Sequence, residues 1–145
     1  MPIKKKLHFL ASMIAVATLA GCVTPPTWTN RGPIELATEK GRIACYTDAN
    51  IIDGERMEGT LCATAESGFF GGGEPEIYFG PWNRKFIKEP VSKTTVGITQ
   101  DYQGKKVFLQ CEPVLGSDKK VEIERKCKVT INDQLLVSAN VTYSK

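Results

Sequence analysis

Histidine is almost absent from this chain of 145 residues, because His8 is the only one. Every segment after residue 8 therefore lacks the imidazole that activates the nucleophile in Ser-His-Asp and Cys-His sites. The same segments lack the histidine ligands that are common in zinc sites. Histidine-based catalysis is therefore excluded for all residues after His8. We expect no catalytic residue, no metal and no cofactor.

An excess of charge of either sign is also missing once the first residues are set apart. The chain has 19 Lys and Arg against 16 Asp and Glu. Lys4, Lys5 and Lys6 are the only charged residues among the first 21 apart from His8, so 16 basic and 16 acidic residues remain from residue 22 on. A neutral chain has no basic field for nucleic acid and no polybasic patch for a membrane surface. We therefore predict no nucleic-acid partner.

A long hydrophobic run is the third absence. The longest apolar stretch covers residues 7–21, which is shorter than the run of about 20 residues that a membrane-spanning helix needs. It follows three lysines and ends in Leu19-Ala20-Gly21-Cys22. A basic start, a short apolar run and small residues before a cleavage point are typical of a secretory signal peptide.

The Leu19-Ala20-Gly21-Cys22 ending resembles the lipobox of bacterial lipoproteins. The resemblance implies that residues 1–21 are a signal peptide that is removed and that Cys22 becomes the lipidated first residue. Val23 and Thr24 follow this cysteine, where many inner-membrane lipoproteins of Gram-negative bacteria carry Asp. The expected location is therefore the cell envelope, with acyl chains holding the protein to the outer membrane on its periplasmic side.

Residues 22–40 read as the anchored cysteine followed by a tether, because three prolines fall between residues 23 and 33. Trp28 in this tether either lies at the lipid interface or packs on the folded domain. Residues 34–40 are the only plausible short helix. We place a single β domain at residues 41–145.

The first strong β signal is Asp53-Gly54, which is typical of a two-residue type I′ hairpin turn. A turn centred there places Cys45 directly opposite Cys62. Cα atoms of opposed residues lie about 4.5–5.5 Å apart, within the range that a disulfide needs. Four cysteines remain when Cys22 is set apart, and an even number in an exported chain also favours disulfides. We predict the disulfide Cys45–Cys62.

In a second β region, residues 94–102 and 105–110 flank Gln103-Gly104, a turn that places Ile98 opposite Leu109 and Val96 opposite Cys111. Residues 121–131 alternate between apolar and polar, as a half-buried strand does. Pairing Cys111 with Cys127 keeps the neighbouring apolar residues on one face, so we predict this second disulfide. The residues expected to face inward on the last two strands are Val121, Ile123, Cys127, Val129, Ile131, Leu135, Val137, Ala139, Val141 and Tyr143, with Arg125 interrupting the series.

These patterns predict an all-β fold, a small antiparallel barrel or sandwich of six to eight strands held by two disulfides. One stretch, residues 69–88, is unusually rich in aromatic residues. They either fill one end of the core or serve as exposed anchors for a partner beside a local basic cluster. The predicted partner surface comprises Phe69, Phe70, Tyr78, Phe79, Trp82, Arg84, Lys85 and Lys88.

Three functions from different classes fit this sequence. The first is a non-enzymatic binding or accessory role towards a periplasmic protein or peptidoglycan. The second is an inhibitor or immunity protein that blocks a periplasmic enzyme, because small disulfide-bonded β lipoproteins that inhibit lysozyme look similar in architecture. The third is a glycan hydrolase with two carboxylates, which needs no histidine. The acidic residues available to it are Asp48, Asp53, Glu55, Glu58, Glu74 and Glu76.

Overall fold

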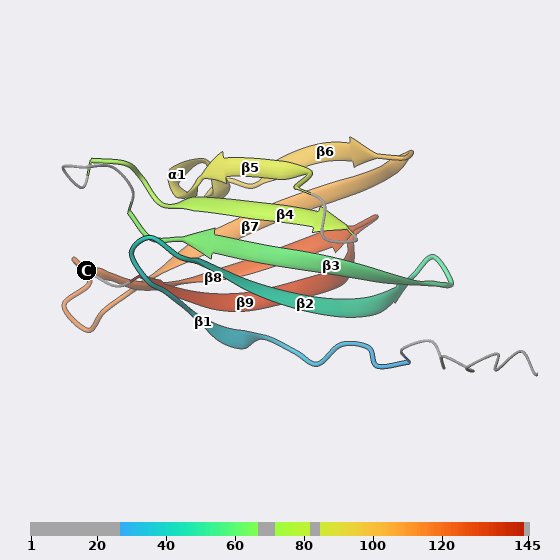
Figure 1. Cartoon of the computed structure of the whole chain (residues 1–145), viewed down its shortest axis with the longest axis horizontal. Coiled ribbons are helices and arrows are strands. Elements are labelled where there is room, and N and C mark those ends of the chain that lie inside the picture. Colours follow the sequence, from blue (N-terminus) through green and yellow to red (C-terminus); the bar gives the residue numbers. More distant parts are fainter. Residues whose placement is uncertain (1–26, 67–71, 82–84, 144–145) are drawn as a thin grey trace, which may run out of the picture.

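The structure is a computed structural model that describes residues 27–66, 72–81 and 85–143 (Figure 1). These ranges hold nine strands and one helical turn. Their bounds are β1 (Ile34–Thr38), β2 (Ile43–Ile52), β3 (Glu55–Thr64), β4 (Glu76–Pro81), β5 (Ile87–Pro90), α1 (Val91–Thr94), β6 (Ile98–Tyr102), β7 (Lys105–Leu115), β8 (Glu122–Ile131) and β9 (Gln134–Tyr143). Within the described ranges, no helix has the length and hydropathy to span a membrane.

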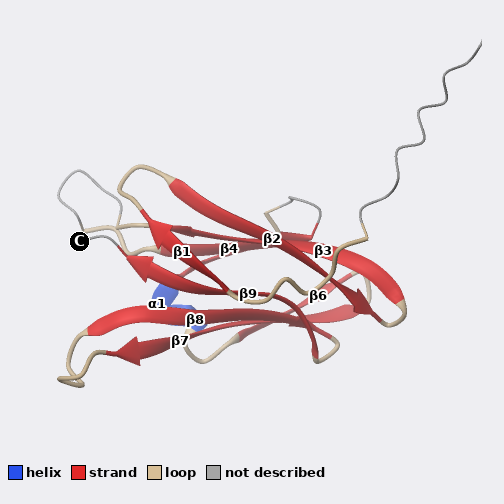
Figure 2. Ribbon diagram, turned by 90° about the horizontal axis from the view of Figure 1, so that it is seen from below, coloured by secondary structure: helices blue, strands red, loops and turns tan. Residues whose placement is uncertain are grey.

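The strands form two sheets that pack face to face (Figure 2). Sheet A has the order β1-β9-β8-β7-β6, and sheet B has the order β2-β3-β4-β5. Every strand pair is antiparallel except β1 with β9. Neither sheet closes into a barrel over the described residues, so the predicted all-β fold is confirmed as a sandwich.

The core lies between the two sheets and consists of aliphatic and aromatic side chains. Sheet B contributes Leu61, Ile77, Phe79 and Ile87, and sheet A contributes Val107, Leu109, Val129, Ile131 and Val141, all of them fully buried. Burial of apolar surface is the main favourable term in such a fold, at about 25 cal/mol per Å².

Both predicted hairpin registers are confirmed. Cys45 pairs with Cys62 and Ile52 with Glu55 across the first turn, while Cys111 pairs with Cys127 between β7 and β8. Both disulfides are present. Asp53 and Gly54 have φ angles of 51° and 83°, the positive values that a type I′ turn requires.

The predicted pairing of Val96 with Cys111 is wrong, although Ile98 does pair with Leu109. Strand β6 begins only at Ile98, and Val96 is 84% exposed. Gly97 lies between them with a φ of 89°, a left-handed conformation that interrupts an extended strand. A Cβ at Gly97 would also fall 2.3 Å from the Phe108 ring, so the chain needs glycine there.

The inward placement of Val121 and Ile123 is also wrong, because both are exposed. The buried part of β7 ends at Cys111, and that of β8 begins at Arg125. The alternation of apolar and polar residues therefore continues into the tip of the β7–β8 hairpin, where there is no longer a core for the apolar side chains to enter.

Leu135 was predicted to face inward, but Leu136 is the buried residue instead, with 1% exposure against 37%. A register shift between Val129 and Thr130 inserts Leu136 as an extra residue in β9. Such a bulge reverses the side-chain alternation locally. Val137, Ala139 and Val141 are buried as predicted, and Tyr143 is half-buried against the core.

The short helix predicted over residues 34–40 is wrong, because residues 34–38 form strand β1 of sheet A. Leu36 and Thr38 are buried while their neighbours are not, which is the period-2 pattern of a strand. β1 runs parallel to β9, with Leu36 opposite Val141. The folded domain thus includes residues N-terminal to residue 41.

Candidate functional site

A row of side chains crosses the solvent-facing side of sheet B. Cys45 on β2 pairs with Cys62 on β3, which pairs with Tyr78 on β4, which pairs with Lys88 on β5. Residues directly opposite each other in neighbouring strands face the same side of a sheet. The pairing therefore gathers a disulfide, an aromatic ring and an ammonium group on one surface.

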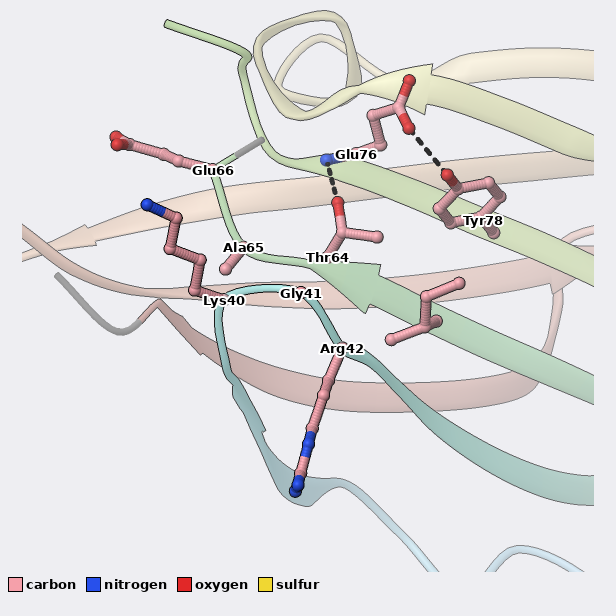
Figure 3. Close-up of a pocket in the computed structure, with 9 residues that line it drawn as sticks. Lys40, Gly41, Arg42, Thr64, Ala65, Glu66, Glu76 and Tyr78 are labelled. Carbon is pink, nitrogen blue, oxygen red and sulfur yellow. Dashed lines mark hydrogen bonds between the residues drawn. The ribbon is translucent and has the colours of Figure 1, made fainter. Parts of the chain in front are cut away.

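Two adjacent hollows lie along this surface, and we call them together the sheet B groove. The first hollow, of about 330 Å³, is centred on the Cys45–Cys62 disulfide and Tyr78, with Lys85 at its rim. The second, of about 320 Å³, lies towards the β1–β2 turn and includes Arg42 and Glu76 (Figure 3). Ile43 and Tyr78 line both hollows, so the groove is continuous.

The floor of the first hollow is mainly apolar and only partly exposed, because Tyr78 is 7% exposed. Cys45 is exposed and Cys62 is half-buried, whereas Cys111 and Cys127 of the other disulfide are 0% and 2% exposed. Gly80 lies opposite Thr60 and adds no side chain to this part of the sheet. The disulfide predicted from the first hairpin therefore forms part of a surface rather than of the core.

Tyr78 is held in place by its neighbours. Its hydroxyl donates a hydrogen bond of 2.6 Å to Glu76 Oε2. This bond and burial raise the pKa of Tyr78 to about 12, so the phenol stays neutral at physiological pH. Lys85 Nζ lies 4.9 Å and Lys88 Nζ 5.6 Å from the ring centroid, distances at which a cation is attracted to an aromatic face.

The predicted partner surface is therefore brought together in part. Tyr78, Lys85 and Lys88 lie at the groove, whereas Phe79 is fully buried between the sheets and cannot contact a partner in this fold. Phe69, Phe70, Trp82 and Arg84 lie outside the described residues.

Sequence reasoning missed Ile43, which is 51% exposed beside the disulfide. A signal for it existed, because the confirmed register places Ile43, Cys45 and Thr47 on one face of β2. The alternation alone did not say whether that face points inward or outward, since the opposite face carries Ala44, Tyr46 and Asp48.

Trp28 packs on the domain. Its carbonyl oxygen accepts hydrogen bonds of 3.2 and 3.0 Å from Nε and Nη2 of Arg56. The guanidinium groups of Arg31 and Arg56 lie 4.1 and 4.8 Å from the Trp28 ring centroid. The second of the two alternatives for Trp28, packing on the folded domain, is thus the one that this structure shows.

The residues after Trp28 bind along β2, and we call residues 28–32 the N-terminal strap. The Asn30 amide donates to the Ala49 carbonyl at 2.6 Å. Buried Asp48 accepts hydrogen bonds from the Arg31 amide at 3.1 Å and from the Tyr46 hydroxyl at 3.2 Å. The strap therefore covers part of an edge strand that would otherwise offer unpaired backbone groups.

Five of the six acidic residues considered for glycan hydrolysis have structural partners, namely Asp48, Asp53, Glu58, Glu74 and Glu76. Glu58 forms an ion pair with Arg56 at 2.7 Å. Hydrogen bonds from Asn132 and Gln134 lower the pKa of Asp53, and hydrogen bonds from Ser92 lower the pKa of Glu74. A general acid at neutral pH needs a raised pKa, so Asp53 and Glu74 have the opposite character. Over the described ranges, no cluster of His, Cys, Asp and Glu has the arrangement of a metal site.

Comparison of the chain with protein-family models, with curated proteins and with solved structures gives no match. The function therefore has to be argued from the sheet B groove, the N-terminal strap and the sequence motif at Cys22.

Proposed function

We propose that this protein is a lipid-anchored protein of the bacterial envelope that binds a periplasmic partner and catalyses no reaction itself. The observation that carries the binding role is the sheet B groove. It is an open hollow with an apolar disulfide and an aromatic ring on its floor, and lysines stand at its rim. Concave apolar surfaces with a few placed polar groups are the usual form of binding sites.

The anchoring role is supported by the Leu19-Ala20-Gly21-Cys22 motif together with the N-terminal strap. Residues 23–27 separate Cys22 from Trp28, and a fully extended chain of that length spans about 20 Å. Because Trp28 is bound to Arg56, a lipid on Cys22 would hold the folded domain close to the bilayer surface.

The anchoring role is tested by replacing Cys22 with Ser in the full-length chain. The proposal expects the variant to leave the membrane fraction, or to accumulate with its signal peptide uncleaved. A variant that is processed and still pellets as an integral membrane protein would contradict the lipid anchor.

The non-enzymatic role is tested by incubating the purified protein with peptidoglycan and following release of soluble fragments. We expect no turnover. Turnover that is lost when one carboxylate is replaced, for example in Glu76→Gln, would show an enzyme instead.

A further inference from the structure

We propose that the sheet B groove binds an extended acidic segment of a partner protein. An apolar side chain of that segment would lie on Ile43 and the Cys45–Cys62 disulfide, next to Tyr78, and a neighbouring carboxylate would contact Lys85. This inference rests on the proposed binding role and names the chemistry of the partner.

The first argument is the charge of the first hollow. Among the side chains that line it, Lys85 carries the only charge. Lys85 is exposed and has no ion-pair partner among the described residues, whereas Lys88 at the same ring is paired with Glu76 at 3.7 Å. A cation without a carboxylate at the mouth of an apolar hollow favours an anionic group on the occupant.

Glu76, the carboxylate beside the Tyr78 ring, is already paired within the protein. Glu76 Oε2 accepts the Tyr78 hydroxyl and also contacts Lys88 Nζ. Its charge is therefore compensated within the protein. Arg42 at the far end of the groove is likewise paired, with Glu39 at 3.2 Å. The second hollow also has Lys40 and Glu66 in its lining, one charge of each sign. Lys85 thus remains as the uncompensated charge of the first hollow.

The size and openness of the first hollow also favour an extended segment. A volume of about 330 Å³ is at the lower end of the range of about 300–1,000 Å³ for small-molecule pockets, and it suits one or two apolar side chains. The hollow is open and continues past Ile43 into the second one. Two adjoining open hollows fit an extended chain better than a compact ligand.

The test uses a phage-displayed library of random linear peptides, selected on the full mature protein purified in detergent. We expect enriched peptides to combine an apolar residue with a nearby Asp or Glu. The best peptide should bind about tenfold more weakly to Lys85→Glu and to Ile43→Glu. Lys128→Glu is the matched control, because Lys128 is an exposed lysine on sheet A, and it should bind like the wild type.

Thermal unfolding of each variant shows whether the fold is intact, and the exposed position of Lys85 predicts no change. Enriched peptides without acidic residues, or equal binding to wild type and Lys85→Glu, would overturn the inference. Binding of purified peptidoglycan sacculi that depends on Lys85, with no peptide selected, would also overturn it, yet it would leave the proposed binding role standing. Failure of both probes, together with no partner contact at the groove in cells, would remove the proposed binding role as well.

Discussion

Gly59 on β3 faces the core, where another side chain would have no room. A Cβ at this position would fall 2.6 Å from Leu136 Cδ2 of the opposite sheet and 2.8 Å from Phe79 Cε2. Overpacking of a filled core typically costs about 1–3 kcal/mol. We therefore expect Gly59→Ala to lower the free energy of unfolding by about that amount, measured by urea denaturation.

The matched control for this substitution is Gly72→Ala, because a Cβ at Gly72 would have no neighbour within 4 Å. The control should unfold at nearly the wild-type urea concentration. Equal stability of the two variants would show that the sheets can separate enough to admit a methyl group at Gly59.

Arg125 shows how a single residue can mislead sequence reasoning. In the sequence it interrupts an apolar face, yet it is only 8% exposed and lies inward like its apolar neighbours. Its Nη1 donates hydrogen bonds to the Val91 carbonyl at 3.1 Å and to Thr95 Oγ1 at 2.7 Å, and its Nη2 donates to Glu122 Oε2 at 2.9 Å. A buried cation is tolerated because it is paired and hydrogen-bonded. Glu122 lies three residues away, but Val91 and Thr95 lie 34 and 30 residues away and give no local signal in the sequence.

At the scale of the elements, three hairpin turns meet at one end of the sandwich through Asp53. Its carboxylate accepts hydrogen bonds of 2.7 Å from both Asn132 and Gln134, and Lys105 Nζ lies 3.6 Å away. The hydrogen bonds from Asn132 and Gln134 are the main reason why the pKa of Asp53 is lowered. The folded state therefore favours the ionised carboxylate.

A lowered pKa makes the contribution of Asp53 to stability depend on pH. The contribution is complete above the pKa of the unfolded chain, about 3.9, and is lost as the pH falls through the lower pKa of the folded state. Asp53→Asn suits the same turn but cannot titrate. We expect the stability difference between wild type and Asp53→Asn to shrink as the pH is lowered from 5 to 2, measured by urea midpoints. A difference that stays constant over this range would contradict the role of the carboxylate.

The two disulfides connect similar hairpins but face opposite sides of their sheets. Cys45 is exposed at the groove, whereas Cys111 and Cys127 are buried in the core. Because a reductant reaches the buried bond only after local opening, we expect Cys45–Cys62 to be reduced about tenfold faster or more under native conditions. Timed thiol alkylation with peptide mapping measures both rates. Equal rates, or earlier reduction of Cys111–Cys127, would show that the outer face of sheet B is covered.

The parts of the fold that could be predicted from the sequence are those with local causes. Asp53-Gly54 and Gln103-Gly104 set turns between adjacent strands, and Cys45 and Cys62 fall into register across the first of them. Cys111 and Cys127 were paired through the alternation of their neighbours. The position of β1 could not be predicted, because its partner β9 lies about a hundred residues further along the chain. The bulge that buries Leu136 has no local turn signal either. For the candidate site, the pairing of Cys45 with Cys62 followed from the first turn, whereas the pairings of Cys62 with Tyr78 and of Tyr78 with Lys88 were not predicted, because no two-residue turn joins those strands. The outward direction of this row depends on which sheet packs below it.

At the scale of the whole molecule, we propose separate roles for the N-terminal strap, which would hold the domain near the bilayer, and for the sheet B groove, which would bind the partner. The strap enters beside the β2–β3 turn and runs along β2 towards β1 (Figure 1). With a lipid on Cys22, the end of the sandwich that carries Asp53 would lie nearest the bilayer.

Site-specific photo-cross-linking in living cells tests most directly whether the sheet B groove is the surface that binds a partner. A photoreactive amino acid would replace Ile43 or Lys85 at the groove, and Lys126 or Lys128 on the exposed face of sheet A. We predict the same cross-linked partner band from positions 43 and 85, and no such band from positions 126 and 128. Cross-links from positions 126 and 128 but none from the groove would contradict it.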